Sequence, residues 1–222
     1  MPEYNRKDIQ NEIEYSFISL FSKKIRIGVV GAGRAGAIKI RHFVKNKCYV
    51  EVLAREFSKD ILELSQLNNN LQLINEEFDD NFLKDKHLII IALDDSTIKY
   101  KIKKYCDDNY KIYIDSTDFK EGMAVVPAER SSRTVNIAVS TKGGNPKGSV
   151  WAAEKLSRAL MEDDDYIEFT TRIRNKAKDI PECKNEIINF VFTEAFRESF
   201  NKGKGVASIK DKFPEEIIKK LF

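Results

Sequence analysis

The chain has few of the residues that bind metals or form disulfides. Its 222 residues include two histidines and three cysteines, and the cysteines at positions 48, 106 and 183 are widely separated. They form no C-x-x-C pair of the kind that indicates a zinc site, and an odd, scattered set does not build a disulfide framework. We therefore expect no metal held by the protein itself and a reducing compartment.

The chain also lacks a large charge imbalance and a long apolar run. It has 38 basic and 35 acidic side chains, a net charge of +3, which gives no electrostatic basis for general nucleic-acid binding. No stretch reaches the roughly 18 consecutive apolar residues of a membrane helix. The first twenty residues mix charges and show no basic start followed by an apolar run, so they do not resemble a signal peptide. We expect a cytoplasmic protein that binds neither nucleic acid nor membrane.

The composition that remains is globular, with 42% hydrophobic and 33% charged residues. Short apolar runs alternate with helical patterns up to about residue 115, which is typical of a doubly wound parallel sheet. The expected strands are Ile25–Val30, Tyr49–Leu53, Leu71–Ile74, Leu88–Leu93 and Lys111–Ile114, with helices between them, including one at Ser96–Cys106. The sequence therefore predicts an α/β fold, with a Rossmann-type NAD-binding domain over residues 1–115.

The pattern changes after residue 115. Two short strands, Ala124–Val126 and Thr134–Val139, are separated by the polar turn Glu129–Arg133 and predict a small β segment over residues 116–148. Residues 149–222 are predicted to form a helical C-terminal domain. Its expected third helix, Lys184–Phe200, has more apolar surface than a small appendage needs, so we expect a partner subunit to cover it. The small β segment is the other expected contact of a homodimer.

A glycine-rich loop follows the first predicted strand. Residues 31–36 read GAGRAG and fit the G-x-G-x-x-G pattern at the junction between a strand and a helix. Gly31 permits a tight turn, Gly33 lets a pyrophosphate approach the backbone, and Gly36 lets the helix pack closely on the strand. Arg34 and Ala35 complete the loop at the helix N-terminus, where unpaired N–H groups face the phosphates. The alternative is a glycine-rich turn that binds no nucleotide.

The acidic residue that usually ends the second strand of an NAD-binding domain is absent. The strand is followed by Ala54, Arg55 and Glu56 instead. Arg55 could hold the 2′-phosphate of NADP or stack on the adenine, and Glu56 could reach a ribose hydroxyl. Both could equally be solvated surface residues. We expect NAD as the cofactor, although these residues alone do not separate NAD from NADP.

Several motifs, in order, resemble the precorrin-2 dehydrogenases, a family that includes the sirohydrochlorin ferrochelatases and the N-terminal part of sirohaem synthases. The glycine loop lies in GVVGAGRAGAIKIRHF, and the central strand continues into IIIALDDSTIKYKI, where Leu93 replaces the usual threonine before Asp94. The segment Tyr113–Pro127 and the later AVSTKGGNP turn at 138–146 complete the resemblance. The order and spacing agree over roughly residues 15–160, and the late Gly-Gly-x-Pro turn is more specific than the glycine loop.

The resemblance implies NAD-dependent oxidation of precorrin-2 to sirohydrochlorin in sirohaem or cobalamin synthesis. It also implies a catalytic aspartate, which one alignment places at Asp118; an ungapped alignment places Thr117 there, and Asp115 is a further candidate. A carboxylate suits a general base that removes a carbon-bound proton, whereas the alternative is that these aspartates cap a turn. Asp94 is assigned to the cofactor. Some family members also insert ferrous iron, so iron as a second substrate stays open.

A tetrapyrrole with many carboxylate arms calls for basic side chains and backbone donors. The resemblance places Thr141, Lys142, Gly143 and Gly144 at this site, and Arg130, Arg133 and Lys147 are further basic candidates. The alternative is a simple turn before a helix.

Two other functions remain open. One is an NAD(P)-dependent oxidoreductase with a different small substrate, for which the resemblance around Gly143 would be accidental. The other is a Rossmann module that senses NAD(H) and regulates a partner without hydride transfer.

Overall fold

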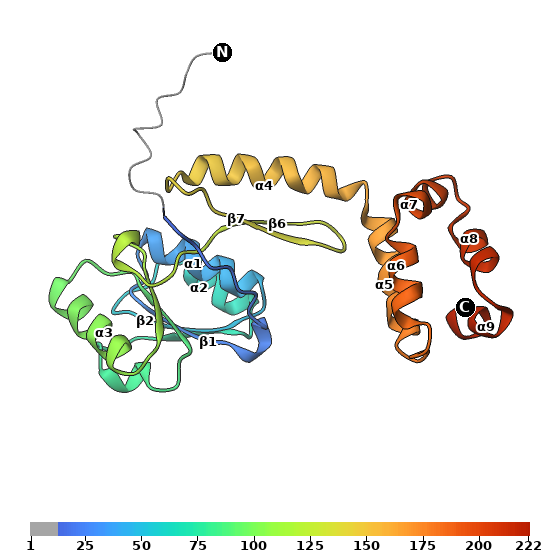
Figure 1. Cartoon of the computed structure of the whole chain (residues 1–222). Coiled ribbons are helices and arrows are strands. Elements are labelled where there is room, and N and C mark those ends of the chain that lie inside the picture. Colours follow the sequence, from blue (N-terminus) through green and yellow to red (C-terminus); the bar gives the residue numbers. More distant parts are fainter. Residues whose placement is uncertain (1–12) are drawn as a thin grey trace, which may run out of the picture. The chain divides into compact units, whose positions relative to one another are not determined.

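The computed structural model describes residues 13–222, which divide into two compact units (Figure 1). One unit spans residues 16–126, and the other combines residues 13–15 with 127–222. Residues 1–12, part of the segment used to predict that no signal peptide is present, lie outside the described residues. The predicted division at residues 115 and 148 stays a prediction.

The first unit contains a parallel sheet in the order β3-β2-β1-β4-β5. Its strands are β1 Arg26–Val30, β2 Tyr49–Leu53, β3 Leu71–Ile74, β4 Leu88–Ile91 and β5 Ile112–Asp115. The connecting helices are α1 Arg34–Lys45, α2 Lys59–Leu67 and α3 Ser96–Asp108, with short 3₁₀ turns η2 Ser22–Lys24, η3 Asp80–Leu83 and η4 Phe119–Glu121. This confirms the predicted Rossmann-type sheet.

The core explains why these runs form central strands. Every residue of β4 is buried, because helices cover both faces of a parallel sheet. Strand β1 lies between β2 and β4, so the strand order reverses beside it. In register, Val30 pairs with Ile91 and Ile91 pairs with Asp115. The loops that follow β1, β4 and β5 therefore leave the sheet at the same edge, which is where such folds bind ligands.

The second unit begins with a hairpin of β6 Ala128–Ser131 and β7 Asn136–Val139. The hairpin was predicted, but its first strand was misplaced at Ala124–Val126. Ala124 and Val126 are apolar because they pack against the core of the Rossmann sheet, and the Ala124 amide donates to the Tyr113 carbonyl. The predicted polar turn was also wrong at residues 129–131, which form β6 with alternating exposure.

Helix α4, Pro146–Met161, packs against this hairpin through small residues. Ser149, Ala153 and Ser157 are its buried residues, spaced four apart so that they lie on one face. The larger side chains Val150 and Trp151 are exposed instead. The helix therefore presents apolar side chains away from its own hairpin.

The remaining chain forms a helical bundle with its own core. Its helices are α5 Asp164–Ala177, α6 Lys184–Val191, α7 Glu194–Asn201, α8 Gly205–Lys212 and α9 Glu215–Leu221. The prediction of one helix over Lys184–Phe200 was wrong, because Thr193 starts a new helix by accepting from the Phe196 amide at 3.2 Å. Ile187, Val191 and Phe196 of this region are buried within the bundle itself, whereas Phe192 is 58% exposed. Cover of the exposed part by a partner subunit stays a prediction.

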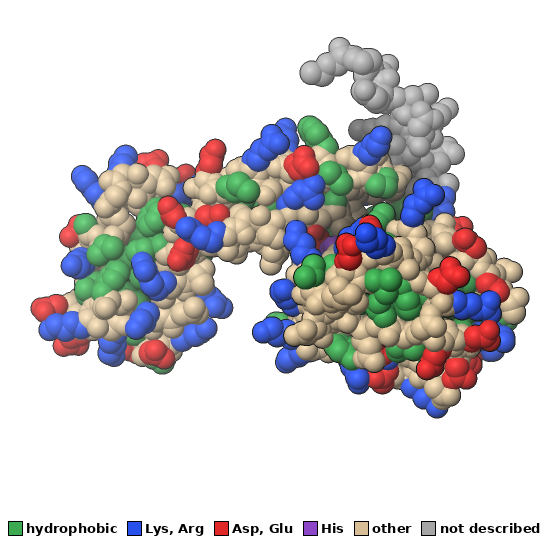
Figure 2. Space-filling view, turned by 180° about the vertical axis from the view of Figure 1, so that it is seen from behind, with side chains coloured by type: hydrophobic (Ala, Val, Ile, Leu, Met, Phe, Trp, Pro, Cys, Tyr) green, Lys and Arg blue, Asp and Glu red, His purple; other side chains and the backbone are tan. Residues whose placement is uncertain are grey.

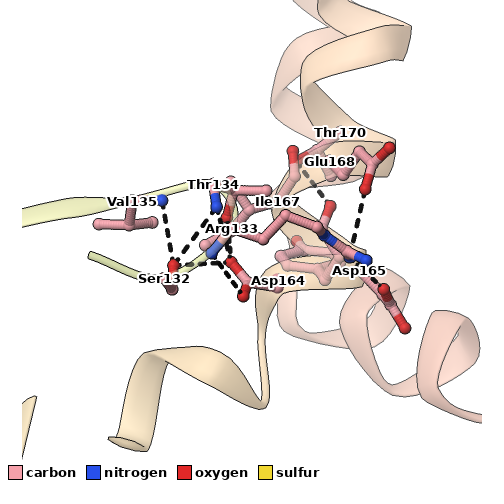
Figure 3. Close-up of polar contacts among 10 residues, drawn as sticks. Ser132, Arg133, Thr134, Val135, Asp164, Asp165, Ile167, Glu168 and Thr170 are labelled. Carbon is pink, nitrogen blue, oxygen red and sulfur yellow. Dashed lines mark hydrogen bonds and ion pairs between the residues drawn. The ribbon is translucent and has the colours of Figure 1, made fainter. Parts of the chain in front are cut away.

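A cluster of hydrogen bonds ties α5 to the hairpin turn (Figure 3). The Asp164 carboxylate accepts from the Ser132 hydroxyl at 2.7 Å, the Thr134 amide at 3.0 Å and the Arg133 amide at 3.1 Å, as well as from the Thr134 hydroxyl. The hydrogen bond from the Thr134 hydroxyl, followed by those of Ser132 and the backbone, lowers the pKa of Asp164 to about 2. The Arg133 guanidinium pairs with Asp165 and Glu168. Arg133, a candidate for binding substrate carboxylates, is therefore already paired with carboxylates of the protein.

The surface carries both signs of charge. On the face drawn in Figure 2, basic and acidic side chains are interspersed over both units. Within residues 13–222, no helix is both long enough and apolar enough to cross a membrane.

Candidate functional site

The glycine loop after β1 has three glycines with three different environments. Gly31 has φ of +99°, and a Cβ there would lie 2.4 Å from the Ala92 carbonyl oxygen. A Cβ at Gly36 would lie 2.8 Å from the Gly31 oxygen and 2.9 Å from the Ala92 Cβ. At Gly33 the nearest atom, the Ala92 oxygen, is 3.9 Å away. The protein itself requires Gly31 and Gly36, whereas Gly33 leaves space that a pyrophosphate can fill.

The start of α1 is suited to binding an anion. Gly33 is the N-cap, in an extended conformation with no side-chain cap, and the first helical turn has no acidic residue. The first helical bond runs from the Ala37 amide to the Gly33 carbonyl at 2.9 Å, so the N–H groups before Ala37 precede the helical bonding pattern. Arg34 is exposed in this turn and Ala35 is half-buried. Helix polarity and the exposed guanidinium both favour a phosphate at this position.

The residues after β2 lie at the surface. Arg55 pairs with Glu77 at 3.0 Å, with both side chains more than three-quarters exposed. Asn75 donates to the Arg55 carbonyl at 2.6 Å and fixes the backbone there. Glu56 is exposed. The Arg55 guanidinium is therefore held by a carboxylate that an incoming phosphate could displace.

Two adjacent aspartates after β4 have different roles. Asp95 is the N-cap of α3, and its carboxylate accepts from the Thr97 amide at 2.9 Å and the Ile98 amide at 3.0 Å. Asp94 is exposed and lies one residue earlier. It follows β4 at the same edge of the sheet as the glycine loop that follows β1. Asp94 is therefore the member of the pair that can face a ligand, as its assignment to the cofactor requires.

Asp115 ends β5 and is buried, with 1% of its surface exposed. Its Oδ1 accepts from the Thr117 amide at 2.9 Å, the Thr117 hydroxyl at 2.8 Å and the Asp118 amide at 3.0 Å. Its Oδ2 lies 3.0 Å from the Lys103 Nζ and 3.2 Å from the Lys99 Nζ. Burial raises the pKa of Asp115, but the hydrogen bonds from Asp118, Lys103 and Thr117 outweigh this and hold its pKa well below the usual value.

Asp118 is in a different environment although it is only three residues away. Its side chain is exposed and caps the 3₁₀ turn η4 by accepting from the Lys120 amide at 3.1 Å. Asp118 therefore caps a turn, as the alternative interpretation predicted, and its carboxylate is also accessible to a ligand. Asp115 lacks the accessibility that a general base needs, and the Thr117 hydroxyl is already bonded to Asp115 and Lys99.

The 141–144 segment in the second unit forms a closed turn before α4. The Thr141 hydroxyl accepts from the Asn145 amide at 2.7 Å, and the Gly144 amide donates to the Thr141 carbonyl at 3.0 Å. Gly144 has φ of +65°, and a Cβ at Gly143 would meet nothing within 4 Å. The Lys142 side chain is exposed, and its carbonyl accepts from the Ile13 amide at 2.9 Å. Thr141 thus has a structural role, while Lys142 and the open face of Gly143 can meet a ligand.

Sequence reasoning missed the two lysines that hold Asp115. Lys99 and Lys103 are four residues apart, so they share one face of α3, and both Nζ atoms reach the end of β5. A helix with two lysines at this spacing beside a strand that ends in aspartate was the available signal. Ser116 was also missed. Its hydroxyl is buried and has no hydrogen-bond partner in the described part of the chain, which is uncommon for a buried polar group.

Residues 13–222 contain no group of three or more histidine, cysteine or acidic side chains able to hold a metal ion. Two of the three thiols are also poorly placed for chemistry. Cys48 and Cys106 are buried, and burial raises the pKa of Cys106 to about 12.

The parallel sheet, the open glycine loop and the uncapped helix start define a dinucleotide-binding Rossmann protein. Comparison with known proteins identifies the family more closely. The chain belongs to the family described as “Putative NAD(P)-binding”, whose model matches residues 18–128. The predicted resemblance to the precorrin-2 dehydrogenases is confirmed.

Individual relatives give the same result. The chain is 28% identical over 190 residues to “Putative precorrin-2 dehydrogenase” of Methanocaldococcus jannaschii, covering 80% of this chain and 90% of the relative. It is 24% identical over 142 residues to “Precorrin-2 dehydrogenase” of Priestia megaterium, covering 64% and 68%. The solved structure “SirC, precorrin-2 dehydrogenase” matches with a TM-score of 0.68 at 20% identity, covering 90% of this chain and all of that one, and shows the same fold.

Proposed function

We propose that this protein is a precorrin-2 dehydrogenase that oxidises precorrin-2 to sirohydrochlorin with NAD, in the cytoplasm, on the route to sirohaem or cobalamin. The names of the relatives from Methanocaldococcus jannaschii and Priestia megaterium support the reaction. The family match supports a nicotinamide cofactor, and our choice of NAD over NADP continues the expectation drawn from the sequence.

One observation carries the proposal: a nucleotide-binding loop and an accessible carboxylate lie at the same edge of one sheet. Gly33 follows β1 and Asp118 follows β5, and the register pairs the ends of these strands through β4. An accessible base beside a dinucleotide loop is the arrangement that proton removal coupled to hydride transfer requires. The space above Gly33 and the uncapped helix start fit the pyrophosphate.

Bound NAD would supply the hydride acceptor. Gly31, Gly33, Arg34, Ala35 and Gly36 would hold its pyrophosphate, and Arg55, Glu56 and Asp94 its ribose and base. Asp118 would take the carbon-bound proton as substrate oxidation removes two electrons, since its carboxylate is exposed. We propose Lys142 and the Gly143 amide as contacts for substrate carboxylates, with Thr141 and Gly144 holding their turn closed.

We propose a homodimer as the working state, with α4 at the contact. Val150 and Trp151 are exposed on this helix, and Trp151 is 65% exposed. Exposed apolar side chains of this size are typical of subunit contacts. The α6–α7 region offers less apolar surface for such a contact, because the bundle buries Ile187, Val191 and Phe196.

The test is an anaerobic absorbance assay with enzymatically generated precorrin-2 and either NAD or NADP. The wild type should form sirohydrochlorin, and Asp118→Asn, which keeps the turn cap, should lower kcat by about 10²–10⁴-fold. Asp79→Asn is the matched control because Asp79 also caps a 3₁₀ turn, accepting from the Asn81 amide at 2.8 Å. Its kcat should equal that of the wild type.

A wild type that binds NAD but leaves precorrin-2 unchanged would overturn the proposal in favour of the sensing module. Turnover of another small substrate would favour a different oxidoreductase. Adding ferrous iron to the product mixture then tests whether the same protein also inserts the metal.

A further inference from the structure

We propose that Asp115, held by Lys99 and Lys103, is a positioning residue that fixes the Ser116–Asp118 turn so that the Asp118 carboxylate faces the reacting carbon. The inference rests on the proposed function for what Asp118 does. The positioning itself can be measured without turnover.

The geometry of the two oxygens carries the argument. Oδ1 of Asp115 accepts hydrogen bonds from both amides of the turn, those of Thr117 and Asp118, at 2.9 and 3.0 Å. These two bonds set the direction in which the chain leaves β5. The Asp118 amide belongs to the residue whose side chain we assign to catalysis, so a rotation at Asp115 would be passed directly to Asp118.

Oδ2 of Asp115 faces the lysines. It lies 3.0 Å from the Lys103 Nζ and 3.2 Å from the Lys99 Nζ, and these side chains are only 19% and 20% exposed. Lys99 also donates to the Thr117 hydroxyl at 2.6 Å, and that hydroxyl donates to Oδ1 of Asp115 at 2.8 Å. The cluster is therefore a closed ring of contacts from α3 through the turn to the end of β5.

Charge makes this ring stiff. A carboxylate accepts hydrogen bonds about twice as strong as those of a neutral acceptor, and it does so here because two ammonium groups keep it ionised. Lys103 also lies 3.4 Å from Glu121 at the end of η4, so the same lysine contacts the chain on both sides of Asp118. A segment held in this way can place a carboxylate reproducibly, which proton transfer demands because a misplacement of about 1 Å can cost 100-fold in rate.

The same features separate this role from catalysis by Asp115 itself. Its side chain is fully buried, its oxygens are engaged by Thr117, Asp118 and the two lysines, and it is held in its ionised form. It has neither an open face for substrate nor a tendency to take up a proton.

The experiment compares backbone amide exchange at Thr117 and Asp118, measured by NMR, with steady-state kinetics. The variants are Asp115→Asn, which keeps the shape but removes the charge, and Thr117→Val, an exposed position where the fold should survive. Thr117→Ser restores the hydroxyl as the conservative rescue. Lys103→Met tests the lysine, and Lys104→Met is its matched control because Lys104 pairs at 3.0 Å with Asp108 on the exposed side of α3.

We expect about tenfold faster exchange of both amides in Asp115→Asn, Thr117→Val and Lys103→Met. The kcat of each should fall by about 100-fold, with KM for NAD and for precorrin-2 within about twofold of wild type. Thr117→Ser and Lys104→Met should match the wild type in both measurements.

Unchanged amide exchange in Asp115→Asn and Thr117→Val would overturn the inference, and so would faster exchange with unchanged kcat. A wild type without activity on precorrin-2 would instead overturn the proposed function. Faster exchange in the variants would then still establish that Asp115 locks the turn.

Discussion

Replacing Gly33 by alanine should weaken NAD binding without harming the fold, whereas the same change at Gly31 should destabilise the fold itself. At Gly33 the new Cβ would have its nearest protein atom 3.9 Å away, an ordinary contact. Alanine is a poorer N-cap than glycine, so we expect a loss of stability below about 1 kcal/mol. The methyl group would occupy the space proposed for the pyrophosphate, and the affinity for NAD should fall by about 10–100-fold, or 1.4–2.8 kcal/mol.

At Gly31 two costs add. A side chain at φ of +99° is strained, which costs about 1–2 kcal/mol. The Cβ would also lie 2.4 Å from a backbone oxygen at the end of β4, and such overpacking costs about 1–3 kcal/mol more. The sum, about 2–5 kcal/mol, is a large part of the 5–15 kcal/mol that holds a typical domain folded.

The assay pairs urea unfolding, followed by circular dichroism, with isothermal titration of NAD. Gly33→Ala should unfold near the wild-type midpoint and bind weakly, while Gly31→Ala should unfold at clearly lower urea. Wild-type affinity in a folded Gly33→Ala would refute the placement of the pyrophosphate over Gly33. Wild-type stability of Gly31→Ala would refute the steric argument.

Three further predictions follow from the surface and the second unit. Arg55→Ala should lower the affinity for NADP about tenfold while leaving the affinity for NAD nearly unchanged. Glu77→Gln, which removes the carboxylate paired with Arg55, should raise the affinity for NADP. Equal effects on both nucleotides in titration calorimetry would contradict this. The carboxylate of Asp164 has a pKa lowered from 3.8 to about 2, so it stabilises the fold above pH 4 and loses this effect as the pH falls toward 2. The difference in thermal midpoint between wild type and Asp164→Asn should shrink over that range, and a constant difference would count against the role. Trp151→Glu should shift sedimentation from dimer to monomer, and an unchanged dimer would exclude α4 as the contact.

The sequence predicted the Rossmann sheet well because its strands follow a strong physical signal. A strand such as β4, buried on both faces, must be apolar throughout, and a short apolar run that ends near glycine fits few other structures. Gly31 and Gly36 were assigned structural roles from their spacing at a strand–helix junction. At both positions an added Cβ would lie within 3 Å of an Ala92 atom.

Other features could not be predicted because the same residue type serves different purposes. Ala124 and Val126 are apolar as strand residues would be, yet they cover a sheet that is distant in sequence. Phe192 continues an apolar helical pattern, but Thr193 caps a new helix and ends it. Likewise, nothing local distinguishes a buried Asp115 from an exposed Asp118, because the lysines that decide the difference lie on another helix.

The division of the chain into units also affects its synthesis. The Rossmann unit is one continuous segment, residues 16–126, so its strands and glycine loop are all synthesised before α4 is translated. Because domains generally fold as units and the N-terminal part folds first during synthesis, the nucleotide loop can form on a nascent chain. A pool of NAD could then stabilise the first half of the protein before the hairpin and helical bundle exist.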